Sequence, residues 1–301
     1  MNHKYKIEIA FVILHYLVAE ETKRCVESIK ENIDSENYRI IIVDNNSGNG
    51  SYELLEKLYQ EDEDIVLIHN EKNEGFARGN NKGIEFVNSK YDVEYICCLN
   101  NDVYVLDKEF LSKLRNEFEK SKFAVAGPLI LSGDGRYDSN PQNIGILKNK
   151  SDVIRSINRC KRMVFINRYY LNWLYLRVKQ FKSRKKMSNN IIKYLPQRLE
   201  NVQLSGACLV FSKIYFQHFN GFCDKTFLYK EEDILIYLLR RKRLLSVFLP
   251  NILVYHKEDA ATDVELKTNK DKNIFIYREY IKSLFVLLNL MEESKKGEDL
   301  V

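Results

Sequence analysis

Short apolar runs alternate with helical patterns through the first half of the chain, and this alternation constrains the fold more than any other feature. The runs predict strands and the stretches between them predict helices, as in the βαβ units of a largely parallel sheet. The predicted strands cover Ile7–Tyr16, Arg39–Val43, Ile65–His69 and Tyr95–Leu99. The predicted helices cover Glu20–Asn32, Ser51–Gln60 and Glu74–Asn88. The sequence therefore predicts an α/β fold with a mixed, mostly parallel sheet flanked by helices.

Two positions in the third predicted helix carry no side chain. Gly79 and Gly83 lie four residues apart, so they fall on one face of that helix. A face without side chains allows a helix to lie close to a sheet. We therefore expect the helix Glu74–Asn88 to pack tightly on the strands.

Beyond Pro141 the composition changes. The stretch from Lys148 to Arg198 contains fifteen Lys and Arg residues against one acidic residue, Asp152. The whole chain has a formal net charge of +5, so the remainder is acidic on balance. Strand-like and helical patterns then return, and Ile274–Leu290 reads as an amphipathic helix.

These changes divide the chain into four parts. Residues 1–147 and 199–290 form two halves of one α/β unit, and the second half ends in the amphipathic helix. Residues 148–198 form a basic helical insertion between the halves, and residues 291–301 form a polar tail.

The basic insertion has three interpretations, which the sequence leaves open. A solvated helical insertion is the first, and a nucleic-acid surface is the second, because Lys and Arg with aromatics suit phosphates and bases. The third is an interfacial element against anionic lipid or a lipid-diphosphate acceptor. The segment NRYYLNWLYLRVKQFKSRKK, at residues 167–186, places aromatics and leucines among basic residues and favours the third. We expect no nucleic-acid partner.

The cysteines and the N-terminal apolar run bear on location. The six cysteines lack metal-ligand spacing, and adjacent Cys97 and Cys98 lie in an apolar run typical of buried thiols, which indicates a reducing compartment. The run Ile9–Val18 is followed by Glu20 and Glu21 rather than a cleavage site. No apolar run approaches the ~18 residues that span a bilayer. We expect a cytoplasmic protein, in peripheral contact with the inner face of the cytoplasmic membrane if the insertion binds lipid.

Polar residues follow three of the predicted strands. Asp44 follows the second strand, His69 and Asn70 end the third, and Asn100 to Asp102 follow the fourth. Ligands of open α/β sheets bind outside the carboxyl ends of the strands. These residues together predict a ligand crevice at one edge of the sheet.

Four ordered segments carry a family resemblance. They are IIVDNNS at residues 41–47, NEGFARGNNKGI at 73–84, LNNDV at 99–103, and LSGACLVFSK with GFCDKTFLYKEEDIL between residues 204 and 235. The chain resembles the family 2 inverting glycosyltransferases with the GT-A fold, particularly their rhamnosyltransferase-like branch. The likeness spans about residues 7 to 285, and the basic insertion is the part that matches poorly.

The resemblance implies an enzyme that transfers a sugar from a dTDP- or UDP-linked donor. The acceptor would be a hydroxyl of a cell-surface polysaccharide or of a lipid-linked glycan precursor. Residues 1–147 would bind the nucleotide sugar and residues 199–290 would face the acceptor. The oligomeric state stays open.

The resemblance also assigns residues to the donor. Asp44 would hydrogen-bond the nucleotide base, Arg78 would reach a phosphate, and Gly206 would let the backbone approach the donor sugar. Arg278 is a further phosphate candidate. The remaining implied donor-binding residues are Asn46, Asn73, Gly75, Phe76, Asn80, Asn100 and Asn101.

A divalent cation would offset the negative charge of the departing nucleoside diphosphate. Mg²⁺ and Mn²⁺ suit oxygen ligands, and the resemblance implies Asp102 as the metal ligand, with His256 in LVYHKED as a second. Asn100 stands where the family's DxD element usually places its first Asp, so one negative charge is missing.

Inversion requires a general base that deprotonates the acceptor hydroxyl. Glu231, Glu232 and Asp233 begin a predicted helix that runs to about Arg243. Acidic residues in a first turn also complement the helix dipole, so the cluster alone does not prove catalysis. Successive helical residues lie about 100° apart, so the three cannot all face one pocket. Glu232 is our first choice and Asp233 our second.

Two other classes of protein remain as alternatives. A nucleotide-sugar nucleotidyltransferase would need a Gly-rich, basic N-terminal signature, and Tyr16 to Thr22 contain none. A non-catalytic basic protein that binds membrane or nucleic acid would leave Asp44, Asp102 and the acidic triplet without a role.

Overall fold

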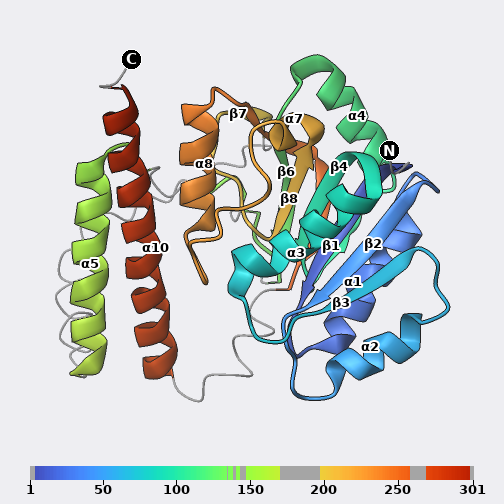
Figure 1. The fold of residues 1–301 in the computed structure, drawn as a ribbon, viewed down its shortest axis with the longest axis horizontal. Helices are drawn as coiled ribbons and strands as arrows, with labels where there is room; N and C mark the ends of the chain where they lie inside the picture. The colour runs from blue at the N-terminus through green and yellow to red at the C-terminus, as the bar shows by residue number, and fades with distance from the viewer. Residues whose placement is uncertain are drawn as a thin grey trace.

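The computed structural model describes residues 4–133, 135–137, 140–142, 147–169, 197–257 and 269–298. In these residues a nine-stranded mixed sheet is flanked by helices (Figure 1). The strands are β1 (Tyr5–His15), β2 (Tyr38–Asp44), β3 (Ile65–His69), β4 (Tyr91–Asn100), β5 (Val103–Val105), β6 (Val125–Ser132), β7 (Leu199–Glu200), β8 (Cys208–Ser212) and β9 (Ser246–His256). The helices are α1 (Ala19–Asn32), α2 (Ser51–Tyr59), α3 (Gly75–Lys90), α4 (Phe110–Ser121), α5 (Lys150–Arg168), α7 (Lys213–Phe216), α8 (Glu231–Arg241) and α10 (Asn269–Glu298).

The sheet has a parallel half and a mixed half. Its order is β3-β2-β1-β4-β8-β6-β9-β5, with β7 paired to β9. The first four strands of this order are parallel, β8 is antiparallel to both β4 and β6, and β9 is parallel to β6. The carboxyl ends of β1 to β4 and of β9 therefore meet at one edge of the sheet.

Apolar residues fill both faces of the sheet. Along β1, Ile9 and Phe11 join one core beneath α1, α2 and α4, whereas Ala10 and Val12 join the other beneath α3 and α8. Side chains of a strand alternate between its faces, so a continuous apolar run is what a strand covered on both sides requires. This explains why the sequence of each predicted strand is a continuous apolar run and does not alternate between apolar and polar residues.

The two glycines of α3 allow that helix to lie close to the parallel strands. A Cβ atom on Gly79 would lie 2.5 Å from a methyl carbon of Leu14, and one on Gly83 would overlap Val12. Real side chains do not approach so closely, so any larger residue would push α3 away from β1 and β2. The predicted tight packing is confirmed.

A helical pair forms a third cluster beside the main sheet. Val153 and Ile157 of α5 pack with Leu284 and Leu287 of α10, and the cluster includes Ile234 of α8. Figure 1 shows α5 and α10 side by side at the left of the view, with α8 next to them. α10 extends beyond both ends of the predicted amphipathic helix, and α5 makes up most of the described part of the basic insertion. Residues 170–196 of that insertion lie outside the described residues.

Two further features of the structure concern the cysteines of β4 and the lengths of the helices. Cys97 and Cys98 are free thiols buried in β4. Within the described segments, no helix combines the length and the apolar character needed to cross a membrane.

Candidate active site

A cleft of about 720 Å³ opens at the carboxyl edge of the sheet, a volume typical of small-molecule sites. It lies between the ends of β1, β2 and β4 on one side and the segments leading into α8 on the other. The cleft brings together ten of the residues that the sequence assigned to the site. They are Asn73, Gly75, Phe76, Asn100, Asn101, Asp102, Gly206, Glu231, Glu232 and His256.

Asp102 and His256 meet at the floor of the cleft. A His256 nitrogen, Nε2, lies 3.3 Å from Oδ1 of Asp102, and the backbone N–H of Lys257 donates to the Asp102 carbonyl at 3.1 Å. The pairing of β5 with β9 creates this contact, because it places Val103 opposite His256. No local sequence pattern predicts this contact, because Asp102 and His256 are far apart in the chain.

Both side chains are ones that a divalent cation accepts. Among the described residues no group of three or more His, Cys, Asp or Glu side chains is placed to hold a metal ion. Mg²⁺ bound with substrate phosphates commonly takes only one or two carboxylates from the protein. Asp102 and His256 therefore fit a cation that also takes oxygens from a diphosphate.

The N-terminus of α8 gives the three adjacent carboxyls different environments. Glu232 faces the cleft, where its Oε1 accepts hydrogen bonds from the backbone N–H of Gly206 at 3.2 Å and from Nε2 of Gln142 at 3.4 Å. Asp233 is buried and accepts a hydrogen bond from Nζ of Lys230 at 3.0 Å. Asp233 does not line the cleft.

Burial raises the pKa values of Glu231 and Glu232. It raises the pKa of Glu232 above its ordinary value, because the charged form is poorly solvated there. Burial, with the neighbouring charge of Glu232, raises the pKa of Glu231 to about 8. The Oε1 atom of Glu231 is buried without a hydrogen-bond partner among the described residues. Glu231 is thus mostly protonated at neutral pH.

The loop before α8 is bonded to α3. The Asn81 side chain donates to the Phe222 carbonyl at 2.9 Å and accepts from the Phe222 N–H at 2.8 Å. The backbone N–H of Phe76 donates to the Phe227 carbonyl at 2.8 Å. Nε of Arg78 donates to the Asp224 carbonyl at 2.8 Å. The motif at residues 73–84 therefore holds the two halves of the chain together.

Six predicted residues do not line the cleft. Arg78 is exposed and bonded to the loop as described, and Arg278 is an exposed residue of α10. Asn80 is buried within α3, where its Nδ2 donates to the Phe76 carbonyl. Asn46 is an exposed loop residue with φ 64°. Asp233 is paired with Lys230, and the remaining residue is Asp44.

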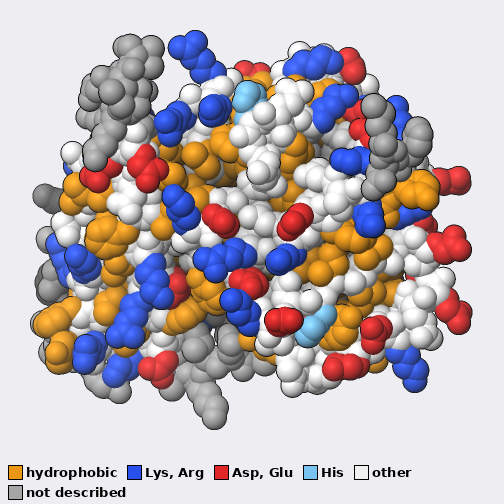
Figure 2. Space-filling view, viewed as in Figure 1, with side chains coloured by type: hydrophobic (Ala, Val, Ile, Leu, Met, Phe, Trp, Pro, Cys, Tyr) orange, Lys and Arg blue, Asp and Glu red, His pale blue; other side chains and the backbone are white. Residues whose placement is uncertain are grey.

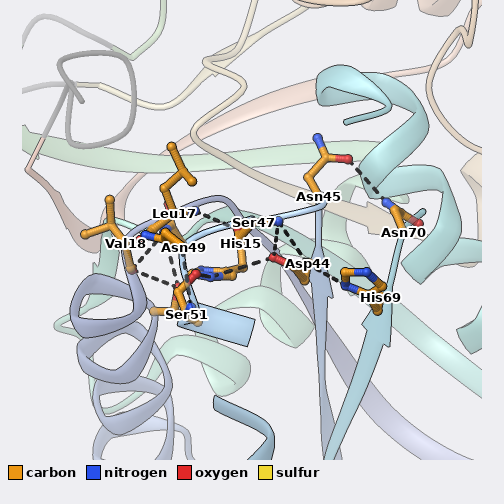
Figure 3. A network of polar contacts seen from close by, with 12 residues as sticks. His15, Leu17, Val18, Asp44, Asn45, Ser47, Asn49, Ser51, His69 and Asn70 are labelled. Carbon is orange, nitrogen blue, oxygen red and sulfur yellow. Dashed lines mark hydrogen bonds and ion pairs between the residues drawn. The ribbon is translucent and has the colours of Figure 1, made fainter. Parts of the chain in front are cut away.

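Asp44 is the last residue of β2, and it is buried there rather than lining the cleft. Its side chain is 1% exposed and accepts from the Ser47 N–H and from Nδ1 of His69 (Figure 3). The neighbouring Asn45 lines the cleft instead, and its side chain bonds Asn73, Asn70 and the Glu74 N–H. The sequence prediction missed Asn45, although it stands inside the motif that identified Asp44.

Other lining residues carried weaker signals. Gln142 gave none, because it lies in a segment with no periodic pattern. The aromatic residues Phe227, Tyr229, Phe275 and Tyr280 line the cleft together with Lys230 and Tyr16. Their clustering depends on α10 returning to α8, which no local pattern predicts.

Comparisons with known proteins identify the family and the fold of the chain. The model of the family described as glycosyl transferase family 2 matches residues 10–192. No curated protein matches the chain.

Solved structures of S. aureus TarS resemble it. The crystal structure of TarS 1-349 matches with a TM-score of 0.52 and 11% identity, over 91% of this chain and 71% of that chain. The crystal structure of TarS matches with a TM-score of 0.51 and 12% identity, over 89% of this chain but only 42% of that chain. A complex of TarS 1-349 with UDP-GlcNAc matches over 48% of this chain and 39% of that chain, with 16% identity and a TM-score of 0.38.

At such identities the first two likenesses concern the fold alone, which is the GT-A fold that the sequence predicted. The family match covers more than half of the chain and includes the end of β4 with Asp102. The chain therefore belongs to glycosyl transferase family 2, and it is a glycosyltransferase.

Proposed function

We propose that this glycosyltransferase inverts the anomeric centre of a dTDP- or UDP-linked sugar and transfers it to a hydroxyl of a cell-surface polysaccharide or lipid-linked glycan precursor. The rhamnosyltransferase-like branch is the part of the family that we favour. The observation that carries the proposal is one cleft lined both by Glu232 and by the Asp102–His256 pair.

The donor side of the cleft suits a diphosphate. Asp102 and His256 would hold Mg²⁺ or Mn²⁺, which supplies positive charge to the departing diphosphate. Asn100 and Asn101 line the same side and offer amide groups for hydrogen bonds to the donor. Asn101 is itself anchored, because its Nδ2 donates to Oγ1 of Thr22 at 3.1 Å.

Glu232 has the properties of the general base. Gly206 and Gln142 fix one carboxylate oxygen, and the raised pKa makes the carboxylate a stronger proton acceptor. A Cβ atom on Gly206 would lie 2.9 Å from Oε1 of Glu232. The absence of a side chain at Gly206 thus lets the base sit close to the backbone.

Aromatic rings on the acceptor side suit a glycan. Phe227, Tyr229, Phe275 and Tyr280 line that side of the cleft, and Phe227 is 38% exposed. Rings of this kind pack against the apolar faces of sugars and leave hydroxyls for polar contacts. This surface supports a saccharide acceptor.

The described part of the basic insertion supports peripheral contact with an anionic membrane at the cytoplasmic face. Five basic residues of α5 are exposed: Arg155, Arg159, Lys161, Arg162 and Arg168. Ile154, Phe165 and Tyr169 are exposed among them. Figure 2 shows basic and hydrophobic side chains interspersed at the left of the view, over α5 and α10. Such a surface suits anionic headgroups and the lipid interface.

Replacement of the base separates catalysis from binding. Glu232→Gln is expected to lower turnover about 10²- to 10⁴-fold while donor binding persists, because the amide cannot accept the proton. Donor turnover and nucleotide binding by calorimetry measure the two effects. Asp233→Asn is the matched control and is expected to keep turnover within about tenfold, since Asp233 is paired outside the cleft. Full activity of Glu232→Gln would refute the assignment.

Replacement of Asp102 is expected to abolish the effect of the metal ion on nucleotide affinity. In the wild-type protein Mg²⁺ or Mn²⁺ is expected to tighten UDP or dTDP binding, and EDTA is expected to reverse this. Asp102→Ala should remove the metal-dependent gain and leave the metal-free affinity near its original value. Asp92→Ala, at the exposed amino end of β4, provides the control. An undiminished metal effect in Asp102→Ala would contradict the site.

Glu231 gives stability a pH dependence. Its folded pKa of about 8 exceeds the ordinary 4.5, so the folded state holds the proton more tightly. The contribution of Glu231 to stability is therefore full below pH 4.5 and falls as pH rises toward 8, by at most about 1.4 kcal/mol per pH unit. Glu231→Gln should raise the melting temperature relative to wild type progressively from pH 5 to pH 8.

The control for this prediction is Glu21, a glutamate whose pKa is lowered rather than raised. Burial of Glu21 is outweighed by hydrogen bonds from Lys257 and Tyr104, which hold its pKa below the ordinary value. Glu21→Gln should therefore change stability by a constant amount between pH 5 and pH 8. A Glu231→Gln difference that is equally constant would show that Glu231 ionises normally.

Charge reversal on α5 tests membrane contact. The triple change Arg155→Glu, Arg159→Glu and Arg162→Glu is expected to weaken binding to phosphatidylserine-containing vesicles at least about tenfold, because each basic residue near such a surface contributes about 1 kcal/mol. Co-sedimentation measures the binding. Reversal of three exposed lysines elsewhere serves as the control: Lys57, Lys108 and Lys120. Equal losses in both triples, or no vesicle binding by the wild-type protein, would exclude a specific α5 surface.

A further inference from the structure

The carboxylate of Asp44 is enclosed by its own neighbours. Oδ2 accepts from Nδ1 of His69 at 2.7 Å, and both oxygens lie 3.2 Å from the Ser47 N–H. Oδ1 also lies 3.8 Å from Nε2 of the fully buried His15. A side chain that is 1% exposed cannot touch a ligand unless these neighbours move. Asp44 therefore acts on a ligand only through another group.

His15 closes the inner side of this network. Its Nδ1 lies 2.7 Å from Oγ1 of Thr22 and its Nε2 lies 2.9 Å from Oγ of Ser51. Burial lowers the pKa of His15 to about 4, against the opposing effect of Asp44, so this imidazole is neutral at neutral pH. His15 thus positions the carboxylate and has no route to the cleft.

His69 closes the outer side and is the accessible member. Its side chain is 41% exposed, and its ring lies 4.7 Å from the ring of Tyr52. Figure 3 shows His69 on the side of Asp44 away from His15. An ionised carboxylate only accepts hydrogen bonds, so the hydrogen between Asp44 and His69 resides on Nδ1. In the neutral imidazole Nε2 is then a hydrogen-bond acceptor.

The position of His69 along the sheet edge fits the base of a nucleotide. His69 ends β3, which is three strands from β4 in the order β3-β2-β1-β4, and Asp102 follows β4. Strands lie about 4.8 Å apart, so about 14 Å separates the two strand ends. An extended nucleoside diphosphate with its phosphates at Asp102 spans such a distance toward β2 and β3. Asn45, which follows Asp44 at the end of β2, lines the cleft between the two ends, and His69 lies beyond the lining residues at the same edge of the sheet.

We propose that His69 determines the nucleotide specificity of this enzyme by accepting a hydrogen bond from a ring N–H of the donor base, with Asp44 fixing its tautomer. This inference rests on the proposed function and assigns its base-reading residue. Uracil and thymine present an N–H at N3, and guanine presents one at N1. Cytosine and adenine present a lone pair at the corresponding ring nitrogen, which would face the lone pair of Nε2. The site therefore selects bases of the first group.

Calorimetric binding of nucleoside diphosphates tests this selection. UDP, dTDP, GDP, CDP and ADP are titrated into the full chain with Mg²⁺, and the wild-type protein is expected to prefer UDP and dTDP to CDP. His69→Ala should weaken UDP and dTDP about 3- to 10-fold, the value of one hydrogen bond, and leave CDP nearly unchanged. The GDP titration distinguishes a pyrimidine N–H from a purine N–H.

Two further variants make the result decisive. The lysine side chain donates hydrogen bonds and accepts none. His69→Lys should therefore lower the preference for UDP over CDP further, until CDP binds as tightly as UDP or more tightly. His218→Ala removes an exposed histidine outside the cleft and should change no affinity. Melting temperatures confirm that each variant folds.

The outcomes separate this inference from the proposed function. If the wild-type protein prefers UDP and His69→Ala keeps the same UDP to CDP ratio, His69 does not read the base and the proposed function stands. If the wild-type protein binds UDP and CDP equally, the selection itself is refuted. If it binds no nucleotide, the proposed function fails and the inference fails with it.

Discussion

The hydrogen bonds between α3 and the loop before α8 set the geometry of the active-site cleft. Asn81 bonds the Phe222 backbone in both directions, and Phe76 donates to Phe227. α3 packs on β1 and β2, whereas the loop leads directly into Glu232. These bonds therefore fix the segment that carries Glu232 relative to the parallel strands on which α3 packs. Held this way, the proposed base Glu232 needs no large rearrangement to face a sugar in the cleft, which lowers the entropic cost of reaching the reactive arrangement.

Three consecutive carboxyls at the start of α8 show how backbone geometry assigns chemistry. Tyr229 and Lys230 both have positive φ, at 69° and 71°, so the chain turns sharply into the helix. The helical rotation then directs Glu232 to the cleft and Asp233 to Lys230, whereas Glu231 borders the cleft with its Oε1 atom buried and without a partner among the described residues. One is the proposed base, one is an ion-pair partner, and one is largely a neutral acid at pH 7. Identical side-chain chemistry thus gives three different behaviours because the surroundings differ.

The sequence predicts those elements and residues that depend on local patterns. The strands, the helices through α3 and the carboxyl-edge crevice follow from apolar periodicity and from polar residues at strand ends. Asp102 and Glu232 followed from motifs, and both line the cleft. Asp44 shows the limit, because its burial depends on His69 from a neighbouring strand. Gln142 and Tyr280 reach the cleft only through long-range packing, which no short window of sequence encodes.

The contact of α10 with the cleft has a consequence for how the enzyme can be divided. Nζ of Lys230 lies 5.0 Å from the centre of the Tyr280 ring, and Phe275 and Tyr280 form part of the cleft wall. Ile234 of α8 is buried in the same cluster as Leu284 and Leu287. A shortened chain that lacks α10 would remove one wall of the cleft and expose the buried face of α8, the helix that carries Glu232. A complete cleft therefore needs residues far beyond residue 192, where the family match ends.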